Sequence, residues 1–407
     1  MPEQSPSQLI NDWQTAAKNK DAKTLSKVST GFTRRLLTTA AAVIGLAPVA
    51  FAQTSGAQAN DPQTFFVLNN QTDPMFNQLL GINSGNVIVG YLGDGMAIHN
   101  NGYVLVPADH YSIDNFTNVP GCNSPPSTLF PPSPCPTQTQ AIGINNATGL
   151  AGQTPFPDIV GFYTDIAGAT HGFLDSVGVQ STIDDPAGLP PHVTTPVQNL
   201  LGVNNALRAA GFWTDNAGHE NGFVAEINTA TTPIAARFAE FTPAKINADL
   251  GLMMSPNTAV ATQTSDINNN NLVCGFYTDG NGNNHPFEVF FNTTTHSFNR
   301  TLPLTPNSNA PTAPLLPNFT SFSPFGCNDN GAVVGSYIVG TPPNQTVHGF
   351  VFDGTDWHNY DAAGSSQTAA FGVMGTFING INNAGVVVGF FSDGENVNGF
   401  VDFVPVP

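Results

Sequence analysis

Residues 380–400 read GINNAGVVVGFFSDGENVNGF, and close variants of this phrase occur five more times along the 407-residue chain. The copies can be aligned on the first asparagine of the phrase, which gives Asn83, Asn145, Asn204, Asn268, Asn328 and Asn382. These residues are 54 to 64 positions apart. A period of this length corresponds to one supersecondary unit per repeat, and such units bury their faces only against their neighbours. The phrase therefore indicates a repeat protein.

Each repeat divides into four short strands at its turn residues. A first strand ends at Gly-Ile-Asn, and Asn-Asn-Ala-Gly forms a tight turn because Asn and Gly tolerate positive φ. The valine run 386–391 is a second strand, an Asp-x-x-Gly loop follows, and a third strand opens with His-Gly-Phe or Asn-Gly-Phe. Aromatic segments such as 357–361 supply the fourth strand. Four antiparallel strands per repeat without helical periodicity are typical of a β-propeller blade.

The two ends of the repeat region complement each other. The last repeat stops after its third strand, at GFVDFVPVP, whereas TFFVLNN at 64–70 has the pattern of a fourth strand and precedes the first repeat. One sheet built from both ends removes an exposed edge. We therefore predict an all-β, six-bladed propeller of four-stranded antiparallel blades, closed by pairing of 64–70 with 400–404.

The first 52 residues differ in composition from the rest. They hold six of the ten basic residues, including Arg34 and Arg35, followed by a modest apolar run and the small-residue site 50–52. This segment resembles a twin-arginine signal peptide cleaved before Gln53. A membrane anchor and a mitochondrial presequence fit less well, because the apolar run is short of the roughly 20 residues that span a bilayer. We predict a removed leader at 1–52 and a single propeller domain at 53–407.

Charge narrows the range of partners. Residues 53–407 contain 25 acidic and only four basic residues, a net charge of −21. Such a surface repels phosphate backbones and anionic lipids, which argues against nucleic acid as a partner. We expect a periplasmic or extracellular monomer that does not insert into a membrane after cleavage.

The repeats also carry a family resemblance. Units with a Gly-Ile-Asn turn, a Val-Val-Gly strand and a His-Gly-Phe strand, as in 171–173 and 348–350, resemble the HAF family of extracellular repeats. In three other blades Asn101, Asn221 and Asn398 stand where the histidine would be. The resemblance covers nearly the whole of 53–407. It implies export and repetition, and it implies no chemistry.

Departures from the repeat supply the candidate ligand-binding residues. Asp266 stands where the other five blades have glycine, on what should be the innermost strand, so we expect it to face the central channel. In the same blade Asp279, Asn281 and Asn283 are spaced like the start of a calcium loop. Neither the glycine nor the closing glutamate of such a loop follows, so an ordinary hairpin loop remains the alternative. Calcium is the one candidate cofactor. The recurrent turn asparagines and loop aspartates are expected to bond their own backbone.

Cysteines and insertions add further expectations. Cys122 and Cys135 bracket an insertion, and in an exported chain they are predicted to form a disulfide. Cys274 and Cys327 are expected to be buried thiols, or to pair if blades four and five bring them together. Three insertions, at 118–138, 245–262 and 302–321, should emerge on one face of the ring. They either bind a ligand or fill gaps between blades.

Catalytic motifs are missing from the sequence. It contains no Gly-x-Ser-x-Gly, no His-Glu-x-x-His, no phosphate loop and no dinucleotide fingerprint, so no catalytic residue is assigned. A dispersed site could draw on acids and histidines that cannot be ranked: Asp109, His110, Asp184, Asp185, His192, Asp356 and His358. We expect a binding or interaction module for an extracellular glycan or protein rather than an enzyme. The alternatives are a calcium-assisted hydrolase or lyase acting on an extracellular polymer, and a surface structural protein.

Overall fold

The structure is a computed structural model of the chain. It describes residues 65–70, 73–94, 100–106, 112–115, 138–146, 157–165, 167–176, 178–253, 256–304, 319–341 and 343–404. Residues 56–104 and 114–407 form one compact unit, which contains all six turn asparagines. Residues 1–55 and 105–113 form a second unit, of which only the ends of two strands are described. The leader with Arg34 and Arg35, and the pair Cys122 and Cys135, lie outside the described residues.

The strands form six antiparallel sheets, one for each repeat. The first three blades are β2 (Asn77–Ile82), β3 (Ile88–Leu92), β4 (Asn101–Val106) and β5 (Ser112–Asn115); β6 (Gln138–Ile144), β7 (Ile159–Thr164), β8 (Thr170–Ser176) and β9 (Val179–Thr182); and β10 (Gln198–Val203), β11 (Arg208–Thr214), β12 (Glu220–Asn228) and β13 (Ala235–Phe241). The last three are β14 (Ala259–Ile267), β15 (Leu272–Asp279), β16 (Asn284–Asn292), β17 (Ser297–Phe298) and β18 (Leu302–Pro303); β19 (Phe319–Cys327), β20 (Val333–Val339), β21 (Thr346–Phe352) and β22 (Trp357–Tyr360); and β23 (Thr376–Ile381), β24 (Val386–Ser392), β25 (Val397–Phe403) and β1 (Phe66–Val67).

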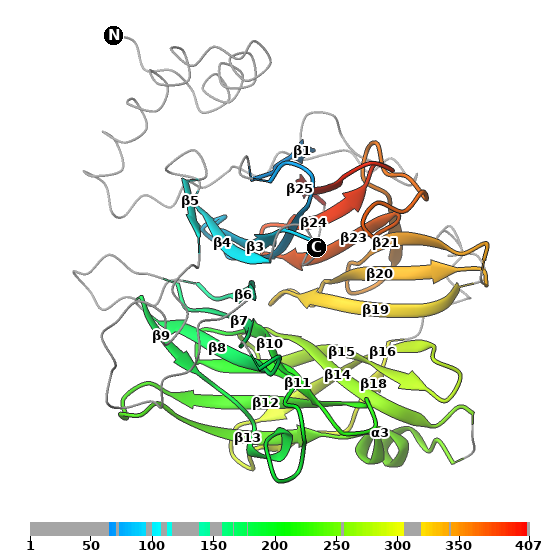
Figure 1. Cartoon of the computed structure of the whole chain (residues 1–407). Coiled ribbons are helices and arrows are strands. Elements are labelled where there is room, and N and C mark those ends of the chain that lie inside the picture. The colour runs from blue at the N-terminus through cyan, green and yellow to red at the C-terminus, as the bar shows by residue number, and fades with distance from the viewer. Residues whose placement is uncertain are drawn as a thin grey trace. The chain divides into compact units, whose positions relative to one another are not determined.

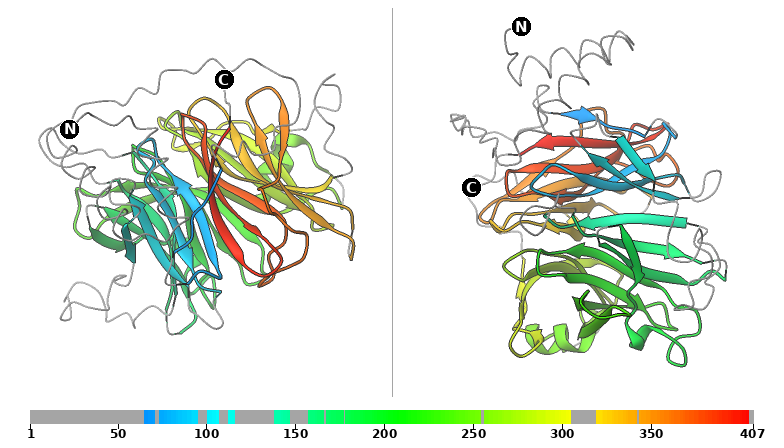
Figure 2. Two further views of the ribbon diagram at one scale, coloured as in Figure 1. Left: turned by 90° about the horizontal axis from the view of Figure 1, so that it is seen from above. Right: turned by 90° about the vertical axis from the view of Figure 1, so that its left-hand side faces the viewer.

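The sheets succeed one another around a common centre (Figures 1 and 2). The first strand of every blade lies innermost and contacts the first strands of both neighbouring blades, from β2 through β23 and back to β2. This arrangement is a six-bladed β-propeller, as the repeat spacing predicts. The described part of the chain contains no helix that is long and apolar enough to cross a bilayer.

The predicted closure of the ring is confirmed. Strand β1 pairs antiparallel with β25, with Phe66 opposite Val401 and Val67 opposite Phe400. The Phe65 ring stacks 5.6 Å from that of Phe400, so the closing strand also adds apolar contact to the last blade. The final sheet is therefore completed from the opposite end of the chain, which leaves no third-strand edge exposed.

The repeated phenylalanine of the third strand and the repeated glycine of the second strand each have a packing reason. The phenylalanine of the third strand fills the centre of its blade, and the side chains of Phe173, Phe223, Phe287, Phe350 and Phe400 are fully buried. A Cβ on Gly389 of the second strand would lie 2.0 Å from the Phe377 carbonyl oxygen and 2.8 Å from the Phe400 ring. Only glycine leaves room for both neighbours. Burying each phenylalanine contributes about 1.5–3 kcal/mol to the stability of its blade.

Blades three to five depart from the expected pattern in three ways. The insertion after blade three contains helix α3 (Pro243–Leu250), which begins with proline and ends at Gly251 in the left-handed region. The fourth strand of blade four is split into β17 and β18, which both pair with β16. The expectation of buried thiols is wrong, because Cys274 in β15 and Cys327 in β19 form a disulfide between blades four and five. The alternative pairing holds, since adjacent blades bring the two residues together.

Candidate functional site in the axial channel

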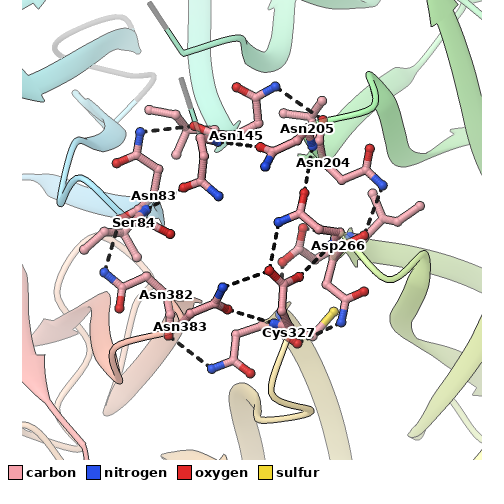
Figure 3. A pocket seen from close by; sticks show the side chains of 18 of the residues that line it. Asn83, Ser84, Asn145, Asn204, Asn205, Asp266, Cys327, Asn382 and Asn383 are labelled. Carbon is pink, nitrogen blue, oxygen red and sulfur yellow. Dashed lines mark hydrogen bonds between the residues drawn. The ribbon is translucent and has the colours of Figure 1, made fainter. Parts of the chain in front are cut away.

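A closed ring of hydrogen bonds surrounds one end of the central channel (Figure 3). Each of the six turn asparagines donates from Nδ2 to the backbone carbonyl of the corresponding asparagine in the next blade. The bonds run Asn83 to Asn145 (3.1 Å), Asn145 to Asn204 (3.3 Å), Asn204 to Asn268 (3.0 Å), Asn268 to Asn328 (2.8 Å), Asn328 to Asn382 (3.1 Å) and Asn382 to Asn83 (3.1 Å). We call this set the Asn ring. It links every blade to the next.

The same side chains also hold their own turns. In Asn268, for example, Oδ1 accepts the backbone N–H groups of Asn270 (2.9 Å) and Leu272 (3.0 Å). All six asparagines of the ring are buried. The prediction that they bond their own backbone is confirmed for the carbonyl oxygen, while the contact of the amide nitrogen with the next blade needs the three-dimensional ring. The next residue in each blade belongs to a second layer, in which Oδ1 of Asn146, Asn205, Asn269, Asp329 and Asn383 accepts the N–H of its counterpart one blade earlier.

Every first strand carries a β-bulge immediately before the glycine of its Gly-Ile-Asn sequence or its equivalent. A bulge re-aims the side chain of its extra residue. The six bulge residues, one per blade, are Leu80, Ile142, Leu201, Ser265, Phe325 and Asn379, and all of them line a cavity of about 230 Å³ between the first strands. We call this cavity the chamber. The first strands run from the insertion loops towards the Asn ring, so the chamber lies on the insertion side of the ring.

The chamber has two unlike walls. At the bulges, blades one to three contribute the aliphatic side chains of Leu80, Ile142 and Leu201, whereas blades four to six contribute Ser265, Phe325 and Asn379. Gln78, Gln140 and Gln263, from the first strands of blades one, two and four, also line the chamber. The Ser265 side chain is only 2% exposed. Its Oγ and the Oδ1 of Asn379 have no hydrogen-bond partner among the described residues. Buried polar atoms are bonded in the great majority of cases, so two such atoms in one cavity call for an explanation.

Asp266 lies where the sequence predicts, in the channel wall, where it lines both the chamber and a smaller cavity of about 70 Å³ at the Asn ring. Its carboxylate accepts backbone N–H groups of Ile267 (2.8 Å) and Cys327 (3.0 Å). Burial raises its pKa to about 6, and these two bonds oppose the rise. A Cβ on Gly202 would lie 2.0 Å from Oδ1 of Asp266, so glycine in the preceding blade makes room for this carboxylate.

In the candidate calcium loop, the carboxylate oxygens of Asp279 bond to groups of the loop and of the next strand. Oδ1 of Asp279 accepts the N–H groups of Asn281 (2.8 Å) and Asn283 (3.0 Å), and Oδ2 lies 3.0 Å from Nε2 of His285. Asp165 and Asp215 bond their loops in the same way through Oδ1. Within the described ranges no three His, Cys, Asp or Glu side chains are grouped as a metal site. Binding of calcium by Asp279, Asn281 and Asn283 stays a prediction.

The histidines of the His-Gly-Phe strands pair with carboxylates. Nδ1 of His171 lies 2.6 Å from Oδ2 of Asp184, and Nδ1 of His348 lies 2.9 Å from Oδ1 of Asp361. Each aspartate follows the fourth strand of the same blade, and Asn69 takes the equivalent place beside Asn398 in blade six. These pairs tie the third strand to the residues after the fourth, so the repeated position has a structural role.

Loops of two kinds meet on one face of the compact unit, which we call the insertion face. It carries the connections from a fourth strand to the next first strand and the loops between second and third strands. Their contacts include Gly280 N–H to the Pro256 carbonyl (2.8 Å) and Ser392 Oγ to the Thr368 carbonyl (2.9 Å). The prediction that the insertions share a face with the Asp-x-x-Gly loops is thus confirmed for the described connection around Pro256.

An exposed aromatic residue stands on this face. Ala370 and Val373 exchange two backbone hydrogen bonds across a two-residue turn, in which Phe371 and Gly372 have φ of 51° and 83°. Positive φ at a bulky residue costs free energy, and such strain concentrates at functional sites. The Phe371 side chain is 45% exposed and lies edge-on to Phe76 at 5.8 Å. Phe76 belongs to the apolar cluster that includes Leu80 of the chamber wall. The sequence does not single out Phe371, because Phe-Gly carries no strong signal for a turn with positive φ at its first position.

Of the acids and histidines that the sequence could not rank, Asp185 lies beside a titratable group of the neighbouring blade, Glu240 of blade three. Asp185 is buried beside Glu240, and the Trp213 indole donates to Oε2 of Glu240 (3.1 Å). Oδ2 of Asp185 has no hydrogen-bond partner among the described residues. Burial, then the Asp185 carboxylate, raises the pKa of Glu240 to about 7. Asp184 bonds His171, His192 is exposed, and Asp356 and His358 lie in blade five around Asp353. Asp109 and His110 lie outside the described residues.

No protein-family model and no curated protein sequence matches this chain. Among solved structures it is similar to a sialidase from Trypanosoma rangeli in complex with sialic acid, with 7% identity and a TM-score of 0.38, over 86% of this chain and 58% of the sialidase chain. It is also similar to a glycosyl hydrolase from Bacteroides ovatus, with 11% identity and a TM-score of 0.31, over 71% of this chain and 95% of the other. At these values the matches say nothing about the function of this chain.

Proposed function

We propose that this chain is an exported propeller of the HAF type that acts as a monomeric binding module for neutral extracellular glycans, which it meets with its insertion face. The observation that carries the proposal is Phe371, an exposed aromatic ring held on a rigid scaffold in a strained turn. An aromatic face packs against the apolar C–H face of a sugar ring, while neighbouring amides and hydroxyls bond its hydroxyl groups.

Charge and composition support a neutral ligand. The net charge of −21 over 53–407 disfavours acidic polymers, and the channel wall beneath the face is rich in amides and aliphatic groups. A protein partner is the other outcome to be tested, because Met75 and Met253 are also exposed on this face, at 52% and 87%. Methionines and aromatic residues are frequent in protein interfaces.

A glycan array probed with the full-length protein and with Phe371→Ala tests the function. We expect binding to neutral glycans that falls at least tenfold in the variant, while the melting temperature stays within a few degrees or rises as the strain is relieved. Phe290→Ala, which removes an equally exposed ring from an outer strand, is the matched control. Absence of binding to any glycan by the parent protein would overturn the proposal.

A hydrolase is the second candidate, and the Asp185–Glu240 pair favours it. A carboxyl group whose pKa is raised to about 7, as that of Glu240 is, can act as an acid beside a second carboxylate that acts as a base. Asp185 is only 3% exposed and caps the short helix Pro186–Gly188, which gives the pair a structural role as well. Release of reducing sugar from an array-positive polymer, lost in Glu240→Gln, would establish the enzyme. If the polymer is unchanged after prolonged incubation with the parent protein, the hydrolase is excluded and the binding function stands.

Calcium remains the proposed cofactor if one is needed. The thermal unfolding of the parent and of Asp279→Asn, each with calcium and with a chelator, tests this directly. A saturating ion at 100 times its Kd would stabilise the folded parent by about 2.7 kcal/mol. If the melting temperature of the parent does not change with calcium, calcium is not a cofactor of this protein.

A further inference from the structure

We propose that the chamber is a binding site for one terminal sugar unit of a neutral glycan, with Ser265 and Asn379 as the residues that bond its hydroxyl groups. This inference rests on the proposed function and assigns a subsite to it. The chamber contains one bulge side chain from every blade, so its lining is fixed by six backbones at once.

The polar wall calls for a ligand with hydrogen-bonding groups. Oγ of Ser265 and Oδ1 of Asn379 have no partner in the described part of the chain, although both are buried. Their residues flank Phe325, since they come from blades four and six. A hydroxyl group can donate to one acceptor and accept from another donor, which is what a serine hydroxyl and an amide oxygen on either side of a ring require.

The aliphatic wall limits what else the ligand can be. Leu80, Ile142 and Leu201 stand opposite the polar wall and offer an apolar surface, while Gln78 and Gln140 of the same side also line the chamber and carry amide groups. A molecule that satisfies both walls has an apolar face and a hydroxyl-bearing edge. A pyranose ring combines these features, whereas a purely apolar molecule leaves Ser265 and Asn379 unbonded.

Size and charge narrow the class to a single neutral unit. The chamber measures about 230 Å³, which is below the roughly 300–1,000 Å³ of typical pockets for drug-sized ligands. Asp266 is the one carboxylate in its described lining, and no cationic side chain is present there to hold an acidic sugar. Both oxygens of Asp266 already accept a backbone N–H group, which occupies part of the capacity of this carboxylate to bond a ligand.

The route to the chamber agrees with the proposed face. At the opposite end, the cavity inside the Asn ring measures only about 70 Å³ and its amides are bonded from blade to blade. A glycan whose last unit sits in the chamber must therefore extend towards the insertion face. Phe371 lies on that face and is connected to the chamber wall through Phe76 and the cluster that contains Leu80.

Saturation-transfer NMR on the full-length protein with methyl glycosides of glucose, galactose, mannose and xylose tests the chamber. We expect at least one methyl glycoside to bind, and the double variant Ser265→Ala with Asn379→Leu to bind it at least tenfold more weakly. The matched control is Ser297→Ala with Asn299→Leu, which makes the same two changes on the exposed outer edge of blade four. The control should bind like the parent.

Two further arms separate the possible failures. Leu201→Phe keeps both polar groups and fills the chamber from its aliphatic wall, so it should also abolish binding, even if the double variant fails to fold. If an array-positive glycan or a methyl glycoside binds the folded double variant as tightly as the parent, the chamber assignment is wrong and the proposed function stands. If the parent binds neither array glycans nor methyl glycosides, both proposals are wrong.

Discussion

The two ends of the axial channel carry amides and hydroxyls in opposite states of hydrogen bonding. At the Asn ring each buried amide nitrogen donates to the next blade and the carbonyl oxygens hold the turns, as Asn268 does with Asn328, Asn270 and Leu272. In the chamber the buried oxygens of Ser265 and Asn379 meet no described partner. The same chemistry serves the scaffold where it is satisfied internally, and it is available to a ligand where it is not.

The largest effect should come from opening the ring. Deleting residues 53–70 removes β1 and the Phe65 contact with Phe400, and exposes the edge of β25. We expect a loss of at least about 5 kcal/mol in the free energy of unfolding, since several apolar side chains lose their burial, together with aggregation through the free edge. Calorimetry and size-exclusion chromatography measure both. If the truncated protein stays monomeric and its melting temperature does not change, pairing of β1 with β25 is not needed to close the propeller.

Removing the disulfide should be the next largest. Cys274→Val with Cys327→Ile restores the residue types of most other blades and unlinks β15 from β19 beside the Asn ring. Closing a loop of 53 residues corresponds to about 4 kcal/mol of stabilisation. Thermal unfolding of parent and variant, each with and without reductant, gives the value. Equal melting temperatures of oxidised parent and variant would show that the Asn ring alone fixes this seam.

Asn268→Leu should cost about 3 kcal/mol. The change removes the donor to the Asn328 carbonyl and the acceptor for two backbone N–H groups, and each buried group left unbonded costs roughly 1 kcal/mol or more. Urea denaturation measures the loss. A change below about 1 kcal/mol would mean that water replaces these bonds and that the two ends of the channel are alike.

Stability should also depend on pH through Asp266, which lies between the two ends. Its folded pKa of about 6 is above the unfolded value of about 3.9, so the unfolded chain loses its proton first as the pH rises. The contribution of Asp266 is therefore present below about pH 4 and lost by about pH 6, an effect of about 1–2 kcal/mol once solvent in the channel is allowed for. The difference in melting temperature between the parent and Asp266→Gly, followed from pH 4 to 7, isolates it. A difference that does not vary with pH would contradict the assignment.

The smallest effect completes the comparison. Asn379→Leu makes the same substitution as Asn268→Leu, but it removes an oxygen that no described group bonds. We expect the free energy of unfolding to change by less than about 1 kcal/mol, or to rise, because no buried partner is left unbonded. The same urea experiment applies. A loss close to that of Asn268→Leu would show that Asn379 belongs to the scaffold.

The sequence predicts the contacts that a residue makes within its own blade better than the contacts it makes with the next blade. The Oδ1 bonds of Asn268 follow from an asparagine turn read locally, and the pairing of β1 with β25 follows from a missing fourth strand. The Nδ2 bond to the next blade has no local pattern, because it depends on how closely adjacent blades approach. Placement of Asp266 in the channel could be predicted, since it replaces a repeated glycine.

The chamber could not be predicted for a different reason. A bulge turns Asn379 towards the axis, yet the residue before the repeated glycine changes from blade to blade as Leu, Ile, Leu, Ser, Phe and Asn. Strand alternation alone assigns such a residue to a face of the sheet and gives no sign of the extra residue. The strained turn at Phe371 is also invisible locally, because Phe-Gly has no strong preference for positive φ at its first position.

The closure by β1 has a consequence for how the chain is made. Its side-chain contacts join residues as far apart as Asn69 and Asn398, so the strand synthesised first in this domain must wait for the strand synthesised last. Contacts of such long sequence separation form slowly, because chain entropy opposes them until the intervening blades are in place. During that interval the edge of β25 is available to other chains. A chaperone that holds residues 65–70 until residue 400 has been synthesised would shorten this exposure and so raise the yield of folded protein.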